Sequence, residues 1–305
     1  MKTEFKNLLD LSEHFPTEID CIEFLAKSRW GDMPVCPHCG SVRKIYKMDN
    51  GKLFKCADCR RQFSVRIGTI FEDSALPLRK WFMAIYLLMA HKKGISSVQL
   101  GKDISVTQRT AWFMLHRIRH AIRIKSFEKK LTGTIEADET YIGGKESNKH
   151  LDKKTENTQG RSTKTKTAVF GICQRNGIVA AETVENLNQE TVQSILMEQV
   201  SANIVTYEFN SYNGLDKHFK SHDRINHGLK EYVRGNIHTN GIESFWAILK
   251  RGIFGIYHSV SKKHLNNYVD EFEYRFNTRN IKDSQRFNKV LMHLNGRLTY
   301  KSLIG

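Results

Sequence analysis

Two closely spaced cysteine pairs constrain this chain more than any other feature of its sequence. The segments CPHC (36–39) and CADC (56–59) are separated by 16 residues, which gives the pattern Cys-x2-Cys-x16-Cys-x2-Cys. Two such knuckles present four thiolates to one tetrahedral zinc ion. Because four cysteines leave no open coordination position, a zinc ion here stabilises the fold and performs no chemistry. The sequence therefore predicts a zinc ribbon with the ligands Cys36, Cys39, Cys56 and Cys59.

The remaining cysteines bear on the cell compartment. Cys21 and Cys173 stand alone, and no signal peptide is visible at the N-terminus. In a chain that stays inside the cell, paired cysteines bind metal more often than they form disulfides. We therefore expect a soluble intracellular protein in which Cys21 and Cys173 are core thiols.

An excess of positive charge narrows the class of partner. The chain has 48 Lys and Arg against 32 Asp and Glu, a net charge of +16, and a pI near 9.6. Such a charge attracts polyanions or anionic membranes. The longest apolar run, residues 81–90, is too short to span a bilayer, and neither a lipidation signal nor a clear membrane-binding helix is present. Nucleic acid is the expected partner, and a merely soluble basic protein is the alternative.

Residues 73–128 have the pattern of a helix-turn-helix. Three helices are predicted: 78–92, 95–104 and 105–123. The apolar residues of the third recur at helical spacing and form a core stripe: Ala111, Leu115, Ile118 and Ile122. Its opposite face is basic: Arg109, His116, His120 and Arg123. A helix with an apolar back and a basic front suits the major groove of DNA, although an ordinary surface helix carries such charges too.

From residue 129 onwards the pattern becomes a mixture of strands and helices. The expected strands are 132–144, a hairpin over 167–185 around an Arg-Asn-Gly turn, 204–208, and one near 224–227. The expected helices are 188–200, 241–254 and 261–277. The stretch 145–166 is polar and Lys-rich, which predicts a loop. This order predicts an α/β fold with a mixed sheet and helices, as in ribonuclease-H-like nucleases.

Such nucleases hold two divalent metal ions between carboxylates from distant parts of the chain. Mg²⁺ is a hard ion and prefers carboxylate oxygens. Asp138 ends the first predicted strand and Glu243 opens a late helix. A lone carboxylate is more often solvated or a helix cap, but elements in this order make both residues candidate ligands.

Several long segments resemble one known family. They are ADETYIGGKE, GRSTKTKTAVFG, YNGL, EYVRGNIHTNGIESFWAILKRGIFGIYH and DEFEYRFNTR, together with the cysteine pairs and GISSVQL…VTQRTAWFMLHRIR. Over residues from about 15 to about 280, the chain resembles bacterial insertion-sequence transposases of the DDE class that carry an N-terminal zinc ribbon. The resemblance implies a ribonuclease-H-like core that cleaves element ends and transfers strands with Mg²⁺ or Mn²⁺. It also implies DNA, both element ends and target, as the partner, a homo-oligomer on that DNA, no membrane association, and a cytoplasmic, nucleoid-associated location in a bacterium.

The patterns and the resemblance together predict the domain organisation. The predicted regions are an N-terminal helical segment (1–30), the zinc ribbon (31–72), the helix-turn-helix region (73–128), the ribonuclease-H-like catalytic domain (129–282) and a C-terminal tail without readable chemistry (283–305).

The resemblance assigns two catalytic residues and leaves the third in question. The family's first Asp maps to Asp138 and its last acidic residue to Glu243. Its second Asp, aligned through YNGL, maps to Tyr207, and 35 residues separate Tyr207 from Glu243, the usual interval. A phenol, with a pKa near ~10, is a poor Mg²⁺ ligand. Glu208 is the candidate replacement, but the next residue along a strand points to the opposite face unless the strand has ended or bulged.

Two hypotheses about activity follow, and two rivals of another kind remain. Either Glu208 swings in and some activity is retained, or this copy is catalytically crippled yet folds and binds DNA, which we favour for turnover. The rivals are a zinc-ribbon DNA-binding regulator with no nuclease role and a host-serving nuclease of the same fold.

Basic residues near these elements are candidates for DNA contact. Lys250 and Arg251 follow Glu243, and the Lys-rich loop contributes Arg161, Lys164 and Lys166. His238 and Asn240 shape the site or cap the helix. The predicted DNA-binding residues are Arg109, His116, Arg123, Lys164, Lys250 and Arg251.

Overall fold

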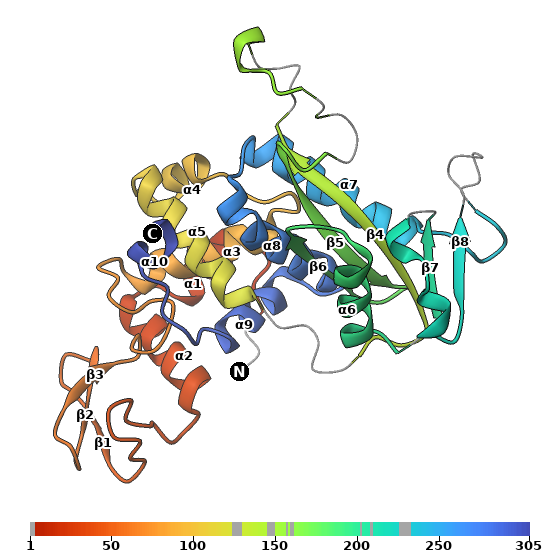
Figure 1. Ribbon diagram of the computed structural model, residues 1–305. Helices are drawn as coiled ribbons and strands as arrows, with labels where there is room; N and C mark the ends of the chain where they lie inside the picture. Colours follow the sequence, from red (N-terminus) through yellow and green to blue (C-terminus); the bar gives the residue numbers. More distant parts are fainter. Residues whose placement is uncertain are drawn as a thin grey trace. The chain divides into compact units, whose positions relative to one another are not determined.

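The structure is a computed structural model that describes residues 4–123, 130–144, 150–156, 158, 162–201, 203–207, 210–225 and 233–305. The chain forms two compact units (Figure 1). The first unit consists of Met1–Arg123 together with Asn280–Gly305, and the second of Ile124–Arg279. Within the described ranges, no helix is long and apolar enough to cross a membrane.

The first unit begins with two helices and a small antiparallel sheet. The elements are α1 (Leu8–His14), α2 (Glu18–Trp30), β1 (Ile45–Lys47), β2 (Leu53–Cys56) and β3 (Gln62–Ser64). The strand order is β1-β2-β3, and both pairs are antiparallel. A capping box starts α2, because Thr17 and Asp20 each accept a backbone N–H from the other. Trp30 at the end of α2 packs edge-on against Phe54 of β2, at 5.3 Å between ring centroids, which joins the ribbon to the helices.

Three helices follow the ribbon, as the sequence predicts. They are α3 (Leu78–Ala90), α4 (Ser97–Asp103) and α5 (Gln108–Ile122). Ser96 and Thr107 cap α4 and α5, each accepting the N–H of the residue three positions later. The predicted core stripe of α5 is confirmed, because its four residues are all 2% exposed or less: Ala111, Leu115, Ile118 and Ile122.

The C-terminal segment belongs to the same unit. It forms α9 (Asp283–Met292) and α10 (Tyr300–Ile304). Phe287 of α9 lies in an edge-to-face cluster with Phe5 and Phe82, at centroid distances of 5.1 and 5.4 Å. The carbonyl of Leu294 accepts the N–H of Ile70 at 3.0 Å. These contacts make residues 283–305 part of the hydrophobic core around α3 and α5.

The second unit is built on a five-stranded mixed sheet (Figure 1). Its strands are β4 (Thr134–Gly143), β5 (Lys166–Gln174), β6 (Val179–Val184), β7 (Asn203–Tyr207) and β8 (His222–Ile225). The order is β6-β5-β4-β7-β8, with β6, β5 and β4 antiparallel and β7 and β8 parallel to β4. The predicted hairpin is confirmed as β5 and β6, which pair through six residues each. The predicted α/β class with a mixed sheet and helices is thereby confirmed.

Helices cover both faces of this sheet. They are α6 (Gln189–Gln199), α7 (Asn240–Gly252) and α8 (Leu265–Asn277), with a π-helical turn at Ile253–Tyr257 after α7 and short 3₁₀ turns at Leu151–Lys153, Asn210–Tyr212, Leu215–Lys217 and Lys262–His264. Successive side chains of a strand point to opposite faces. On β4, Ile135 and Ala137 join the core beneath α6, whereas Ile142 joins the core beneath α7 and α8. We call these the α6 face and the α7 face.

Candidate active site and zinc centre

The four paired cysteines meet at one point of the ribbon. Their sulfur atoms all lie within 4.8 Å of one another, with 3.7 Å from Cys36 to Cys59 and from Cys39 to Cys56. A tetrahedral zinc ion with Zn–S bonds of ~2.3 Å separates its ligands by about 3.8 Å. The cluster therefore fits a structural zinc ion, while His38, between the first two ligands, is exposed. In the described part of the chain this is the only group of three or more His, Cys, Asp or Glu side chains arranged to hold a metal.

Asp138 is the central carboxylate of the candidate active site. It lies on the α7 face of β4, where its Oδ1 accepts the N–H of Glu139 at 2.8 Å and its Oδ2 accepts the indole N–H of Trp246 at 3.0 Å. Burial raises the pKa of Asp138 from 3.8 to about 7, and the negative charges of Glu139 and Glu243 add to this upward shift. A carboxyl group whose pKa is shifted this far is typical of a functional site.

Glu243 reaches the same region from α7. Its side chain is exposed in the first turn of the helix and accepts the hydroxyl of Thr239 at 2.7 Å. Trp246, one turn further on, holds Asp138, so the helix that carries Glu243 is tied to the strand that carries Asp138. The close approach of the Trp246 ring to the sheet depends on Gly171, the β5 partner of Asp138. A Cβ atom at Gly171 would lie 2.6 Å from that ring.

Tyr207 ends β7 and makes a polar contact with Glu139, which lies on the opposite face of β4 from Asp138. Its hydroxyl donates to Oε1 of Glu139, and the hydroxyl of Tyr212 donates to Oε2 of the same carboxylate at 3.1 Å. Tyr207 and Tyr212 both belong to the core beneath α6. The ladder between β4 and β7 ends at the pair Glu136–Val205, two residues before Asp138 and Tyr207. By strand alternation from Val205, the partner of Glu136, position 207 starts on the Asp138 side of the sheet, but the Tyr207 ring is turned into the core beneath α6.

The donor set for a divalent metal is therefore incomplete among the described residues. Asp138 and Glu243 offer the hard oxygen ligands that Mg²⁺ prefers. Within the described ranges no third carboxylate forms a metal-binding group with them. Glu208, the candidate replacement, lies outside the described residues.

Glu136, a buried carboxylate with several polar contacts near the site, was not among the residues predicted from the sequence. It lies on the α7 face two residues before Asp138, is 1% exposed, and its Oε2 accepts the N–H groups of Gly241 and Ile242 at 2.7 and 3.1 Å. These are first-turn N–H groups of α7, so a buried carboxylate from β4 caps the helix that carries Glu243. A Cβ atom at Gly241 would lie 2.8 Å from that Oε2, which explains the glycine in NGIES. The alternation of side chains along a strand could have identified Glu136 from the sequence, since it puts Glu136 and Asp138 on the same face of β4.

Arg175 completes this network around the start of α7. Its Nε donates to Glu136 Oε1 at 3.2 Å, and its terminal nitrogens donate to the carbonyls of Asn236 and His238 at 2.6 and 3.0 Å. The His238 ring lies 3.4 Å from the same carboxylate oxygen. α7 begins at Asn240, and Thr239 is the N-cap residue, so Asn240 does not cap the helix. The loop before α7 is fixed by Arg175 and Glu136 instead.

We expect Glu136→Ala to destabilise the second unit by about 3 kcal/mol, because it leaves the half-buried Arg175 and two helix N–H groups without their shared acceptor. Urea unfolding followed by circular dichroism measures the loss. Glu198→Ala is the matched control, since Glu198 is exposed on α6 and should change stability by no more than about 0.5 kcal/mol. Equal stability of the two variants would contradict the capping role.

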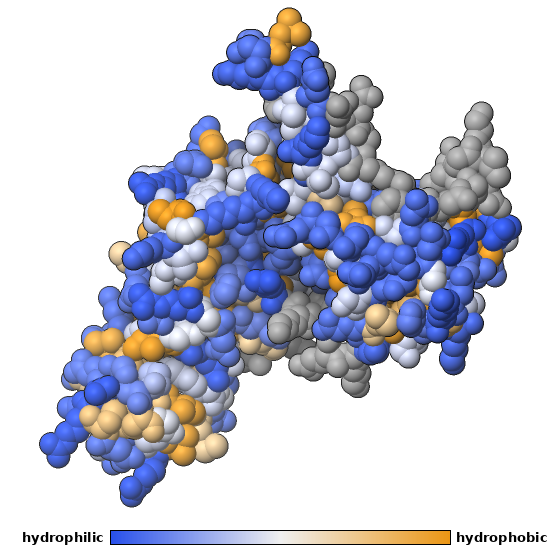
Figure 2. All heavy atoms as spheres, in the orientation of Figure 1, coloured by the Kyte–Doolittle hydropathy of each residue, from blue (hydrophilic) through white to orange (hydrophobic). Residues whose placement is uncertain are grey.

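The predicted DNA-binding residues differ in their surroundings. Arg123, Lys164, Lys250 and Arg251 are exposed. Arg109 is exposed too, and its guanidinium donates to the hydroxyl of Tyr300 at 3.0 Å. Figure 2 shows hydrophilic side chains over most of the visible surface, as the net charge of +16 leads one to expect. Arg161 lies outside the described residues.

The placement of His116 on the basic front of α5 is wrong. Its side chain is 1% exposed and lies against the Trp112 ring, at 4.4 Å between centroids. The buried part of α5 is wider than the predicted stripe because the C-terminal segment covers a second side. Arg117, one residue further on, is 5% exposed and donates to the carbonyls of Leu298 and Ile70.

Comparison with known proteins agrees with this geometry. The ISXO2-like transposase domain family matches residues 130–277, and the transposase zinc-ribbon domain family matches residues 16–62. A protein described as an uncharacterized protein in transposable element ISH50, from Halobacterium salinarum, is 30% identical in an alignment of 278 residues that covers 86% of this chain and 91% of that protein. An uncharacterized transposase-like protein from Haemophilus influenzae is 33% identical over 111 residues, 36% of this chain and 89% of that protein.

Solved structures add little. The crystal structure of the Mos1 strand transfer complex is 13% identical, covers 72% of this chain and 79% of that one, and has a TM-score of 0.30. A TM-score this low supports no argument about this chain. The family matches and the Halobacterium relative carry the assignment: the chain belongs to the ISXO2-like transposases, DNA transposases that combine a zinc ribbon with a DDE-class domain.

Proposed function

We propose that this transposase binds the DNA ends of an insertion sequence, and that its cleavage and strand-transfer activity is impaired at position 207. The ancestral reaction is metal-dependent phosphodiester cleavage followed by joining, as the family implies. Asp138 and Glu243 are the two retained ligands for Mg²⁺ or Mn²⁺, which would activate the attacking oxygen and stabilise the leaving one. Glu208 is not required in this proposal.

One observation carries the proposal. The Tyr207 hydroxyl donates to Glu139 in the core beneath α6, whereas Asp138 lies on the α7 face with Trp246. A phenol that is held there cannot complete a carboxylate site, and its pKa near ~10 makes it a poor ligand at neutral pH. Glu136 and Trp246 still join α7 to the strand that carries Asp138, as expected of a site that lost a single ligand.

DNA binding is proposed to survive this loss. The chain as a whole has a charge of +16, and Lys250 and Arg251 are exposed on the helix that carries Glu243. Phosphate contacts by such residues give an affinity that falls steeply with salt. Assembly on two paired ends further implies a homo-oligomer on DNA.

We expect the full-length protein to bind a blunt 30-bp duplex with an affinity that falls linearly in log–log plots against salt. The double variant Lys250→Ala/Arg251→Ala should reduce the slope by about 1 for each phosphate that the variant no longer neutralises. Fluorescence anisotropy at several salt concentrations measures this slope. Lys289→Ala removes an exposed positive charge from α9, in the other unit, and serves as the control. A slope that stays the same in the double variant would contradict DNA binding at this face, and absence of duplex binding would overturn the proposed function.

A further inference from the structure

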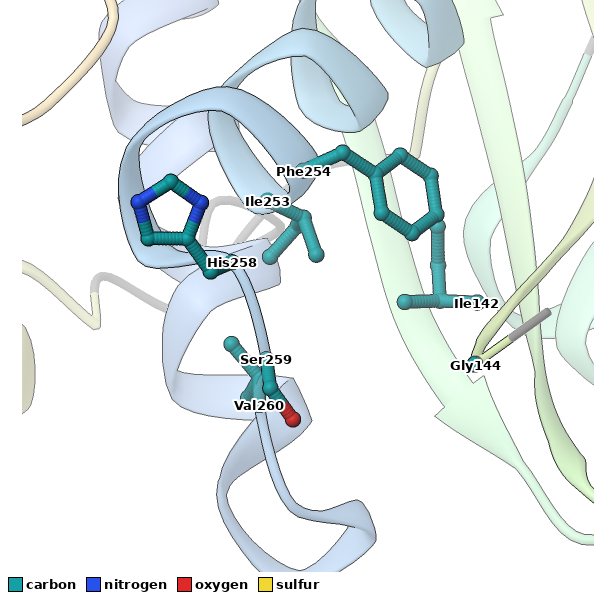
Figure 3. Close-up of a pocket in the computed structure, with 8 residues that line it drawn as sticks. Ile142, Gly144, Ile253, Phe254, His258, Ser259 and Val260 are labelled. Carbon is teal, nitrogen blue, oxygen red and sulfur yellow. The ribbon is translucent and has the colours of Figure 1, made fainter. Parts of the chain in front are cut away.

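A cavity of about 410 Å³ lies on the α7 face, the face of the sheet that also carries Asp138 (Figure 3). Its lining includes Ile142 and Gly144 at the end of β4 and, after α7, Phe254, His258, Ser259 and Val260. Ile142 is four residues beyond Asp138, so the two side chains share a face and lie about 13 Å apart along the strand. The opposite wall continues the helix that Glu243 opens.

The wall formed by residues 253–260 is held firmly in place. The hydroxyl of Tyr257 donates to Glu271 at 2.7 Å, and Glu271, which is fully buried, is paired with Arg275 at 2.8 Å. The Tyr257 ring also packs edge-on against Tyr268, at 4.7 Å between centroids. Buried ionic contacts of this kind define one conformation of the π-helical turn, and π-helical turns are frequent at functional sites.

Two residues of this anchored wall have features that packing alone does not require. Phe254 is 43% exposed, although the segment around it is fixed. His258 has a φ of 59°, a left-handed conformation that a residue with a side chain rarely adopts. Strained residues and exposed aromatic rings at a cavity are typical of ligand sites. In Figure 3 the Phe254 ring and Ile142 form one side of the cavity, with Ser259 and Val260 across from them.

The charge of the segment that contains this wall indicates a ligand with a polyanionic backbone. From Lys250 to His264 the chain has four Lys and Arg residues and no Asp or Glu. Lys250 and Arg251 precede the wall, Lys262 and Lys263 follow it, and all four are exposed. An aromatic surface flanked by cations is the arrangement with which proteins hold single-stranded nucleic acid, the bases on the ring and the phosphates on the cations.

We propose that this cavity receives one unpaired nucleobase of a DNA strand that crosses the Asp138–Glu243 site, stacked on Phe254. The inference rests on the proposed DNA binding and adds a specific contact to it. A sphere of this volume is only about 9 Å across, so it admits a single base in the manner of base-flipping enzymes and excludes a duplex.

The test compares a blunt 20-bp duplex with the same duplex carrying an 8-nucleotide single-stranded overhang, using the full-length protein. Phe254→Ala should weaken binding of the overhang DNA about 10-fold and leave binding of the blunt duplex unchanged. Phe254→Trp should restore overhang binding. Met197→Ala is the matched control, because Met197 is 40% exposed on α6, at the other face of the sheet. 2-Aminopurine placed at successive overhang positions should show one position whose fluorescence changes on binding to the wild type and not to Phe254→Ala.

A second variant blocks the cavity and leaves the Phe254 ring in place. A Cβ atom at Gly144 would have no atom within 4 Å, so Gly144→Leu should fold normally and narrow the cavity. We expect it to weaken overhang binding as Phe254→Ala does. If both variants bind the overhang DNA like the wild type while the blunt duplex still binds, the nucleobase site is refuted and the proposed function stands. If neither DNA is bound by any form of the protein, both are refuted.

Discussion

Replacing Tyr207 by aspartate is expected to raise DNA cleavage and strand transfer by about 10³-fold or more, the order of effect seen when one member of a catalytic constellation is restored or removed. The variant places a carboxylate at the end of β7, next to the strand that carries Asp138, and removes the phenol that donates to Glu139. The carboxylate of the new aspartate then supplies, together with Asp138 and Glu243, the third hard oxygen ligand for Mg²⁺ or Mn²⁺. Gel assays on DNA that carries the element's own ends, with Mg²⁺ or Mn²⁺, measure both steps.

The controls separate the carboxylate from the loss of the phenol. Tyr207→Asn has a similar size to the aspartate variant and should remain as inactive as the wild type. In the Tyr207→Asp protein, Asp138→Ala should abolish the restored activity, which a DNA-binding regulator without a nuclease centre would not show. Wild-type activity within a few-fold of Tyr207→Asp would contradict the impaired-site hypothesis and would favour a contribution from Glu208. Cleavage without joining would favour a host-serving nuclease.

Replacing one zinc ligand, Cys56→Ser, is expected to release the zinc ion and unfold residues of the ribbon. Structural zinc contributes roughly 10–16 kcal/mol of apparent binding free energy in small zinc domains, far more than a three-stranded sheet of this size can replace. The sheet β1-β2-β3 has strands of three, four and three residues, and its core is chiefly Phe54 and Phe63. Metal analysis should show one zinc per chain in the wild type and none in the variant, and limited proteolysis should cleave between residues 40 and 62.

Cys21→Ser is the matched control for this experiment. Cys21 is buried in α2 of the same unit, and burial raises the pKa of its thiol to about 12, so it behaves as a small apolar side chain. The variant should keep its zinc and its resistance to proteolysis in the ribbon. A Cys56→Ser protein that retains an intact ribbon, or a wild type that folds without zinc, would show that the four thiols have another role.

Local patterns were enough to predict much of the architecture. The spacing of Cys36, Cys39, Cys56 and Cys59 predicted a zinc ribbon because four thiolates around one ion admit few arrangements. Alternating and helical periodicities predicted the order of strands and helices, and hence the mixed sheet. The stripe Ala111–Ile122 was correct for the same reason, since one apolar side of a helix must be buried.

Contacts between segments that are distant in the sequence decided the rest. Arg117 is buried because residues 283–305 return to α5, and no pattern within α5 encodes that return. Glu136 became the cap of α7 only when the sheet brought it within 3 Å of an N–H group 105 residues later. The direction of Tyr207 was decided by Glu139 and Tyr212, which lie on other elements. Periodicity describes one element at a time, whereas burial, capping and the direction of a polar side chain depend on which elements pack together, and only the tertiary structure contains that information.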